Sequence, residues 1–283
     1  MRPAKIEYRR PSSVAEAVQM LASSGGKALA GGHSLIPAMN LRLSEPGTVI
    51  DIGRLNELRG ISVKGNILSI GALTTHAEIA ASADVRTHCP ALAAACGQVG
   101  DPQVRNWGTL GGNLAHADPA SDPPTVVLAC GGILHVQGPS GVRTVRADDF
   151  FVDLFTVDLQ PGELITSIEL PSLRGYKSAY AKMPHPASRY AVVGVCVAME
   201  VEGSRCKQAR VAVGGATSKA TRATRAEAAL TGSTLDEAAL DKAASAIMDD
   251  VGDGGMGDIY ADASYRRAMA GAYLKRAVRA ALA

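Results

Sequence analysis

Apolar residues near the start of the chain recur first with the period of a helix and then with that of a strand. The first stripe predicts a helix over residues 13–22 that ends at Gly25. A strand-like run at 27–30, a glycine loop, a helix-like segment at 35–41 and a strand-like run at 48–52 follow. This order favours a parallel pair of strands with the glycine loop at the carboxyl end of the first strand, where α/β sheets usually bind ligands.

The next part of the chain mixes strand-like runs with helices. Polar, glycine-rich residues 100–121 have the character of one long connection, and connections of that length are usually functional. Asp122 then has the position of an N-cap with Pro123 behind it, which predicts a helix as far as Cys130. Strand-like runs, some of them paired as hairpins, lie at 61–63, 67–70, 133–145 and 163–170.

The composition shifts after Pro171 to three strand-like runs and then to alanine-rich helices, which predicts a small antiparallel sheet packed on helices. The last helix carries Tyr265, Met269, Tyr273 and Leu274 at helical spacing, a pattern typical of core packing. The expected fold is therefore α+β (mixed α/β). We expect two N-terminal lobes, about 1–57 and 58–175, and a C-terminal domain, 176–283. Its strands lie at 176–182, 191–201 and 208–213, and its helices at 221–230, 235–249 and 264–282.

Charge and composition exclude several classes of function. The formal net charge of the 283 residues is +2, too small a field to gather nucleic acid or an anionic membrane. Aromatic residues make up 4% of the chain, which leaves few rings for base stacking. The longest apolar stretches are too short to cross a bilayer, and no apolar run follows the first basic residues as a secretory signal would require. We therefore expect a cytoplasmic protein with no membrane span and no nucleic-acid partner.

The positions of the cysteines and histidines argue against a metal site in this chain. None of the five cysteines belongs to a C-x-x-C pair, which fits buried reduced thiols and argues against an iron–sulfur or zinc site carried by this chain in short clustered motifs. No two of the six histidines have metal-ligand helical spacing, so no metal site is expected. Ser34 and Ser121 lack a G-x-S-x-G setting, which makes a hydrolase a poor reading.

The chemical signal lies in two glycine loops, residues 30–35 and 109–114. Each places a glycine pair beside hydroxyl or amide side chains, just ahead of an apolar helical stretch. A pyrophosphate needs close approach to backbone N–H groups, which glycine allows. A single Gly-Gly pair is more often only a tight turn. Neither loop matches the dinucleotide fingerprint G-x-G-x-x-G or the P-loop, so a nucleotide here would be bound in another way.

Longer motifs around these loops resemble a known family. The run Ala30 to Asn40 is similar to the first FAD loop of the flavin-carrying medium subunits of molybdenum hydroxylases, of the carbon monoxide dehydrogenase and xanthine dehydrogenase type. The run Val104 to Asp122 resembles the second FAD loop of that family along its whole length. One departure is Trp107, where the family often has a second basic residue. The resemblance extends to residues 9–11, 71–76, 188–194 and 265–267, and so spans nearly the whole chain.

The resemblance implies a PCMH-type fold whose two N-terminal lobes hold an extended FAD. The two loops would line its pyrophosphate and ribityl region, Asp122 its ribose or adenosine end, and Tyr190 and Lys182 would approach the isoalloxazine. Other readings stay open: Asp122 as a plain N-cap, Tyr190 as a core tyrosine, Lys182 as a solvated edge residue. The implied FAD contacts are Ala30, Gly31, Gly32, His33, Ser34, Leu35, Thr109, Gly111, Gly112, Asn113, His116, Asp118, Asp122, Leu164, Ile165, Lys182 and Tyr190.

The function that the resemblance implies is electron transfer within a complex. A large subunit would hold molybdopterin and a small subunit two 2Fe–2S clusters, in a dimer of heterotrimers. This chain would take electrons from the nearer cluster and pass them from FAD to an external acceptor; no residue is assigned to catalysis. Two alternatives stay open: a self-contained flavoenzyme with its substrate at the flavin, and an assembly subunit without flavin.

Overall fold

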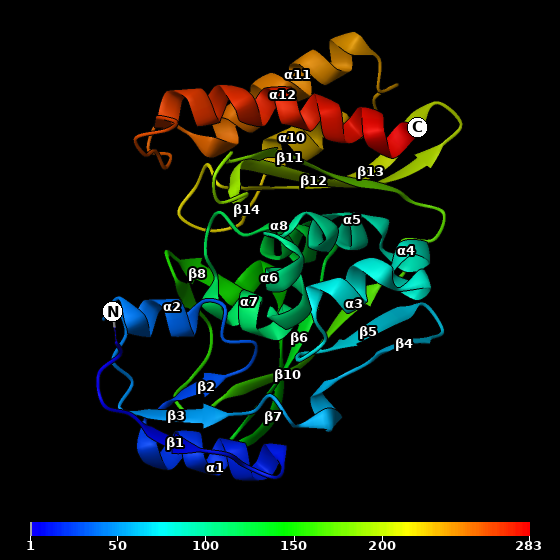
Figure 1. Ribbon diagram of the computed structural model, residues 1–283. Coiled ribbons are helices and arrows are strands. Elements are labelled where there is room, and N and C mark those ends of the chain that lie inside the picture. The colour runs from blue at the N-terminus through cyan, green and yellow to red at the C-terminus, as the bar shows by residue number, and fades with distance from the viewer. Residues whose placement is uncertain (1) are drawn as a thin grey trace.

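The computed structural model describes residues 2–283 and has the expected α+β architecture. Figure 1 shows a stack in which the N-terminal elements lie at one end and the C-terminal helices at the other. The first lobe contains a three-stranded parallel sheet of order β1-β3-β2. The predicted parallel pairing of the strands that flank the first glycine loop is therefore confirmed. Its elements are β1 (Glu7–Arg9), α1 (Val14–Ser24), β2 (Lys27–Leu29), α2 (Leu35–Asn40) and β3 (Thr48–Asp51).

The second lobe is built on a five-stranded antiparallel sheet of order β4-β5-β10-β6-β7. Both predicted hairpins are present, and helices cover one face of the sheet around a large apolar core (Figure 1). The strands are β4 (Ile61–Lys64), β5 (Ile67–Gly71), β6 (Ile133–Gly138), β7 (Gly141–Arg146) and β10 (Leu164–Pro171), after a 3-10 turn, η1 (Asn56–Leu58). The helices are α3 (His76–Ala81), α4 (Ala83–His88), α5 (Pro90–Gln98) and α8 (Asp122–Ala129).

The prediction that residues 100–121 form a long irregular connection is wrong. They contain two short helices, α6 (Pro102–Trp107) and α7 (Leu110–His116). Each helix begins at a side-chain cap: Asp101 accepts a hydrogen bond from the N–H of Val104 at 2.8 Å, and Thr109 accepts one from Gly112 at 3.2 Å. These caps satisfy helix-end donors, which stabilises helices too short to persist alone. The sequence patterns also gave no sign of α9 (Ala147–Phe150), β8 (Phe151–Asp153) or β9 (Thr156–Val157).

The C-terminal part is a four-stranded antiparallel sheet of order β11-β12-β13-β14. The three predicted strands are present, and the two-residue β14 is additional. Helices α10 and α12 pack on one face of the sheet, and α5 and α8 of the second lobe approach the other (Figure 1). The strands are β11 (Lys177–Pro184), β12 (Ala191–Glu202), β13 (Arg205–Gly214) and β14 (Thr221–Arg222), and the helices are α10 (Thr224–Leu230), α11 (Glu237–Val251) and α12 (Ala263–Leu282).

Two expectations about side chains have different outcomes. All five cysteines are free and buried, as predicted. Of the stripe on the last helix, Leu274 is fully buried, but Tyr265 is 42% exposed and does not belong to the core. Across the described residues 2–283, no helix combines the length and the apolar character needed to cross a bilayer.

Candidate functional site

The first glycine loop leaves its backbone donors free. Residues 31–34 follow the carboxyl end of β2 and precede α2. Within residues 2–283, none of the four N–H groups of this segment donates a hydrogen bond to a protein acceptor. Gly32 has a φ of +74°, a conformation that side-chain-bearing residues rarely adopt. Neighbouring unpaired amides in such a turn form a concave donor surface that suits an anion such as a phosphate.

The second glycine loop uses its backbone donors internally. At the start of α7 the N–H of Leu110 donates to the carbonyl of Thr74 at 3.0 Å, and that of Gly111 to the carbonyl of Ala72 at 2.8 Å. The hydroxyl oxygen of Thr109 accepts from the N–H of Gly112 at 3.2 Å, and its carbonyl accepts from the N–H of Asn113 at 3.0 Å. The N–H groups of residues 110–113 are thus already bonded within the protein, whereas those of residues 31–34 are free to meet a pyrophosphate.

The glycines of the second loop serve close packing instead. A Cβ on Gly111 would lie 2.5 Å from the Cβ of Ala72 in the turn after β5. A Cβ on Gly112 would lie 3.6 Å from the Cβ of Ala30, so the start of α7 lies against the first loop. Gly31 meets the same constraint from the other side, since its Cβ would lie 1.8 Å from the backbone oxygen of Trp107. Glycine thus brings the two loops together.

A small cavity of about 150 Å³ opens where the two loops meet, at the carboxyl ends of β2 and β3. Arg59 is fixed at its edge, because its guanidinium donates to the carbonyls of Gly53 at 3.0 Å and Leu73 at 3.3 Å. Arg59, Thr75 and Asn106 were not predicted as site residues; only their position in the fold brings them here. The cavity is lined by Ala30, Gly31, Gly53, Arg59, Leu73, Thr75, Asn106, Trp107 and Thr109.

Asp122 does not cap α8. The N-cap is Ser121, and the Asp122 carboxylate is instead buried between the second lobe and β11. Its Oδ2 accepts a hydrogen bond from the ammonium of Lys182 at 2.7 Å, and its Oδ1 accepts one from the hydroxyl of Tyr180 at 2.5 Å. The ammonium also donates to the carbonyl of Gln98 at 3.0 Å. The reading of Lys182 as a solvated edge residue is therefore wrong, since its side chain is 1% exposed.

Tyr180 is a site residue that the sequence analysis missed. Residues two apart on a strand share one face, so Tyr180 and Lys182 point to the same side of β11. Gly194 lies opposite Lys182 on β12, and a Cβ there would be 2.1 Å from the Tyr180 hydroxyl oxygen. The absence of a side chain at Gly194 leaves room for the hydroxyl that Asp122 binds. The two-residue spacing was a usable signal for Tyr180.

Burial dominates the electrostatics of this cluster. It raises the pKa of the Asp122 carboxyl, while the Lys182 ammonium and the Tyr180 hydroxyl oppose that rise. The pKa of Tyr180 is raised well above its ordinary value, first by burial and then by the charge of Asp122. Tyr190 is 43% exposed, and burial of part of its ring beside Asp118 raises its pKa to about 12. Both tyrosines therefore keep their protons at neutral pH.

The other predicted site residues fall into two groups. Leu164 and Ile165 lie in β10 and are buried in two different apolar cores, 7% and 3% exposed. His116 and Asp118 follow α7 directly: the His116 ring lies 5.1 Å from the Phe155 ring, and Asp118 accepts from the N–H of Ala120 at 2.9 Å. Burial lowers the pKa of His116, so its imidazole is neutral at neutral pH.

The remaining predicted contacts lie at the two loops themselves. The Asn113 side chain on α7 accepts a hydrogen bond from the hydroxyl of Ser121 at 2.9 Å. His33 is exposed, and its Nδ1 lies 3.0 Å from the carbonyl of Gly31. Ser34 and Leu35 are half-buried where α2 begins. In the part of the chain that the structure describes, no three His, Cys, Asp or Glu side chains are grouped as a metal site.

Comparison with known proteins identifies the family of this chain. The family described as the FAD binding domain in molybdopterin dehydrogenase matches residues 4–173, and the carbon monoxide dehydrogenase flavoprotein C-terminal domain matches residues 178–281. The carbon monoxide dehydrogenase medium chain of Hydrogenophaga pseudoflava is 38% identical, over 100% of this chain and 99% of its own. The nicotine 6-hydroxylase medium subunit of Paenarthrobacter nicotinovorans is 36% identical, over 96% of each chain.

Solved structures of related enzymes contain chains with the same fold. Carbon monoxide dehydrogenase from Hydrogenophaga pseudoflava superposes with a TM-score of 0.96 at 40% identity, covering 100% of this chain and 99% of the other. Quinoline 2-oxidoreductase from Pseudomonas putida 86 superposes with a TM-score of 0.92 at 32% identity, covering 100% and 99%. The likeness therefore includes both N-terminal lobes and the C-terminal sheet and helices.

Proposed function

The chain belongs to the FAD-binding oxidoreductase subunits of molybdenum hydroxylases, and we propose that it takes electrons from 2Fe–2S clusters on a partner subunit and passes them through FAD to an external acceptor. FAD supplies the redox chemistry, since it can exchange electrons singly or in pairs, while the protein sets its position and electrostatics. The observation that carries the proposal is the set of four free N–H groups in residues 31–34, held against the start of α7.

In this proposal the first loop binds the pyrophosphate. The N–H groups of Gly31, Gly32, His33 and Ser34 supply the donors, and charged acceptors strengthen such bonds. The second loop supplies shape: Gly111 and Gly112 let α7 approach. This arrangement fits a pyrophosphate because the first loop offers neighbouring free donors, while the N–H groups of residues 110–113 are already bonded within the protein.

The isoalloxazine end is proposed to lie toward the C-terminal sheet. Tyr190 would hold it directly, with Lys182 and Asp122 buried behind it. The ammonium of Lys182 donates to Asp122 and to the carbonyl of Gln98 and its side chain is 1% exposed, so Lys182 would act on the ring through its charge and through the position of Asp122. Tyr190 is close to this cluster, because the N–H of the next residue, Ala191, donates to the carbonyl of Ala120 at 3.0 Å. Leu164, Ile165, His116 and Asn113 would support the site by packing and hydrogen bonding.

Flavin content tests the proposal directly. The purified chain should be yellow and release FAD rather than FMN on denaturation. Gly32→Ala should weaken FAD retention about tenfold, because a side chain at a φ of +74° shifts the loop and disperses its amides. Gly65→Ala is the matched control, since Gly65 has a φ of +58° in the β4–β5 turn with open space around it. A colourless protein that takes up no FAD, or equal loss in both variants, would overturn the assignment.

The proposal extends to organisation and partners. We propose an FAD-binding domain, residues 1–175, and a C-terminal domain, 176–283, supported by the bounds of the two family matches and by a separate C-terminal core. We also propose a large molybdopterin subunit and a small iron–sulfur subunit in a dimer of heterotrimers in the cytoplasm. Affinity purification from the native host tests this: both subunits should co-purify, whereas a flavin-loaded chain recovered alone contradicts the relay and favours a self-contained flavoenzyme.

A further inference from the structure

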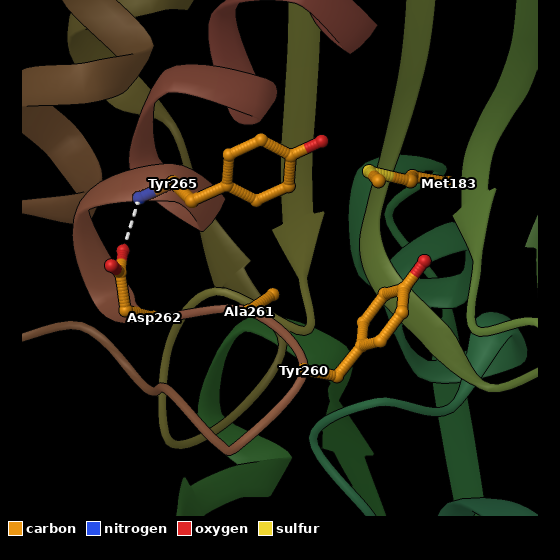
Figure 2. Close-up of a pocket in the computed structure, with 5 residues that line it drawn as sticks. All are labelled: Met183, Tyr260, Ala261, Asp262 and Tyr265. Atoms are coloured by element: carbon orange, nitrogen blue, oxygen red, sulfur yellow. Dashed lines mark hydrogen bonds between the residues drawn. The ribbon is translucent and has the colours of Figure 1, made fainter.

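A second pocket lies in the C-terminal domain, away from the glycine loops. It has a volume of about 410 Å³ and opens where the segment before α12 approaches the end of β11. Tyr260 and Tyr265 are 48% and 42% exposed. Figure 2 shows their phenol rings and the Met183 side chain around one space. Its five lining residues are Met183, Tyr260, Ala261, Asp262 and Tyr265.

A buried arginine holds the wall of this pocket in place. Arg266 is 6% exposed, and its guanidinium donates to the carbonyls of Val192 at 3.0 Å and Gly215 at 2.8 Å on the sheet. The same group donates to the carbonyl of Ala261 at 3.2 Å. It also pairs with Asp258, whose carboxylate accepts from the N–H groups of residues 260 and 261. The tyrosine-bearing segment is thus tied to the sheet, which gives the pocket a fixed shape.

The lining favours a neutral aromatic ligand. None of the five residues is basic, so the pocket offers no charge partner to a phosphate. Asp262 is occupied as the N-cap of α12, accepting from the N–H of Tyr265 and the hydroxyl of Ser264, both at 2.8 Å. The hydroxyls of Tyr260 and Tyr265 donate to no protein acceptor among residues 2–283, so both can serve a ligand oxygen. Two ring faces and a thioether suit a planar ring.

The pocket is connected to the residues proposed to hold the isoalloxazine. Met183 follows Lys182 directly on β11, so its side chain points to the opposite face of the sheet, where the C-terminal core lies, and the strand itself separates the two side chains. The Tyr260 ring lies 4.6 Å from the His185 ring, and the N–H of His185 donates to the carbonyl of Tyr190 at 2.7 Å. The His185 Nδ1 accepts from two N–H groups of its own turn, which orders that turn. The edge strand β11 and this ordered turn therefore separate the pocket from the proposed flavin contacts.

We propose that this pocket binds the external electron acceptor and that the acceptor is a neutral quinone. The two phenol hydroxyls would donate to its carbonyl oxygens, with Met183 beneath the ring. A quinone bound there takes two electrons from the reduced flavin and two protons from solvent, which reaches the open pocket, and leaves as the hydroquinone. The flavin returns to its oxidised state and releases to solvent the protons that it carried when reduced. The inference rests on the proposed function and adds the chemical class of the acceptor.

Menadione, a naphthoquinone, is the probe. Equilibrium dialysis with the purified, FAD-loaded complex should show saturable binding. Tyr260→Ala and Tyr265→Ala should each raise the dissociation constant about tenfold, because each removes a ring face. Tyr265→Phe removes only a hydroxyl and should give a smaller rise. Tyr176→Ala is the control, since Tyr176 is 39% exposed at the other end of β11, and its dissociation constant should equal that of the wild type.

Flavin reoxidation provides the second measurement. After anaerobic reduction, the rate of flavin reoxidation should saturate with menadione, and the half-saturating concentration should rise in the pocket variants by the same factor as the dissociation constant. FAD content should equal that of the wild type in all variants. A complex that holds FAD but binds no menadione, or variants that reoxidise with unchanged half-saturation, would overturn the acceptor site alone. A complex without FAD would overturn the proposed function instead.

Discussion

The buried pair of Lys182 and Asp122 allows a sharp test of the site. Lys182→Met keeps the length of the side chain and removes its charge, which leaves the Asp122 carboxylate with one hydrogen bond, from Tyr180. The two side chains are 1% and 4% exposed. Breaking a buried ion pair from one side costs about 3–5 kcal/mol, because the remaining charge stays buried without its partner. We expect that loss of unfolding free energy near neutral pH.

The loss should depend on pH with a definite sign. Burial already raises the pKa of Asp122 above its ordinary value of 3.8, and removal of the ammonium raises it further. A carboxyl group whose pKa is raised in the folded state stabilises the fold below its unfolded pKa, and that contribution is lost as pH rises through the folded pKa. The variant should therefore approach wild-type stability in acid and fall away from it as pH increases.

Urea denaturation measures this difference. Unfolding followed by Trp107 fluorescence and by circular dichroism, at about pH 5 and about pH 8, should show a larger deficit at the higher pH. Lys275→Met is the control, because Lys275 pairs with Asp241 on the surface and its removal should hardly move the midpoint at either pH. An equal deficit at both pH values would refute the reasoning that an uncompensated carboxylate causes the loss.

Three other substitutions test separate parts of the site. Gly111→Ala should lower the unfolding free energy by about 1–3 kcal/mol, since its methyl would lie 2.5 Å from the Cβ of Ala72; unchanged thermal melting would contradict the packing role. Thr109→Ala removes the acceptor for the N–H of Gly112 and should cost about 1 kcal/mol, which Thr109→Ser should restore in the same melting experiment. Because the pKa of Tyr190 is raised to about 12, flavin reduction should have the same pH dependence in the wild type and in Tyr190→Phe; a titration near neutral pH seen only in the wild type would argue against a protonated phenol.

Elements with strong local patterns could be predicted from the sequence. The β-loop-α-β order near the N-terminus specified the parallel pairing of β2 with β3, and the three long strands of the C-terminal sheet lie close to their predicted bounds. The segment 100–121 was misread because its glycine content outweighed its capping residues. Asp101 before Pro102 and Thr109 before Leu110 were helix-start signals, and the structure shows that both act as caps.

The hydrogen-bond partners of Asp122 could not be predicted, because they are distant from it in the sequence. An Asp just before proline at the start of a helix has the local features of an N-cap whether or not its carboxylate is used that way. Its real partners, Tyr180 and Lys182, lie 58 and 60 residues further along the chain. Only the packing of the C-terminal sheet against α8 brings them within hydrogen-bond distance, and no local pattern near residue 122 encodes that packing.

The glycine loops show that two similar motifs can use glycine for different structural reasons. Gly32 has a positive φ, and Gly31 is pressed against the backbone of Trp107. Gly111 is packed against Ala72, and its amide is already bonded there. All these positions require glycine, but only those in the first loop also leave N–H groups free. A substitution in the second loop should therefore reduce FAD binding only as far as it disturbs packing. One in the first loop should reduce FAD binding by more than its cost in stability explains, because it also displaces free N–H groups.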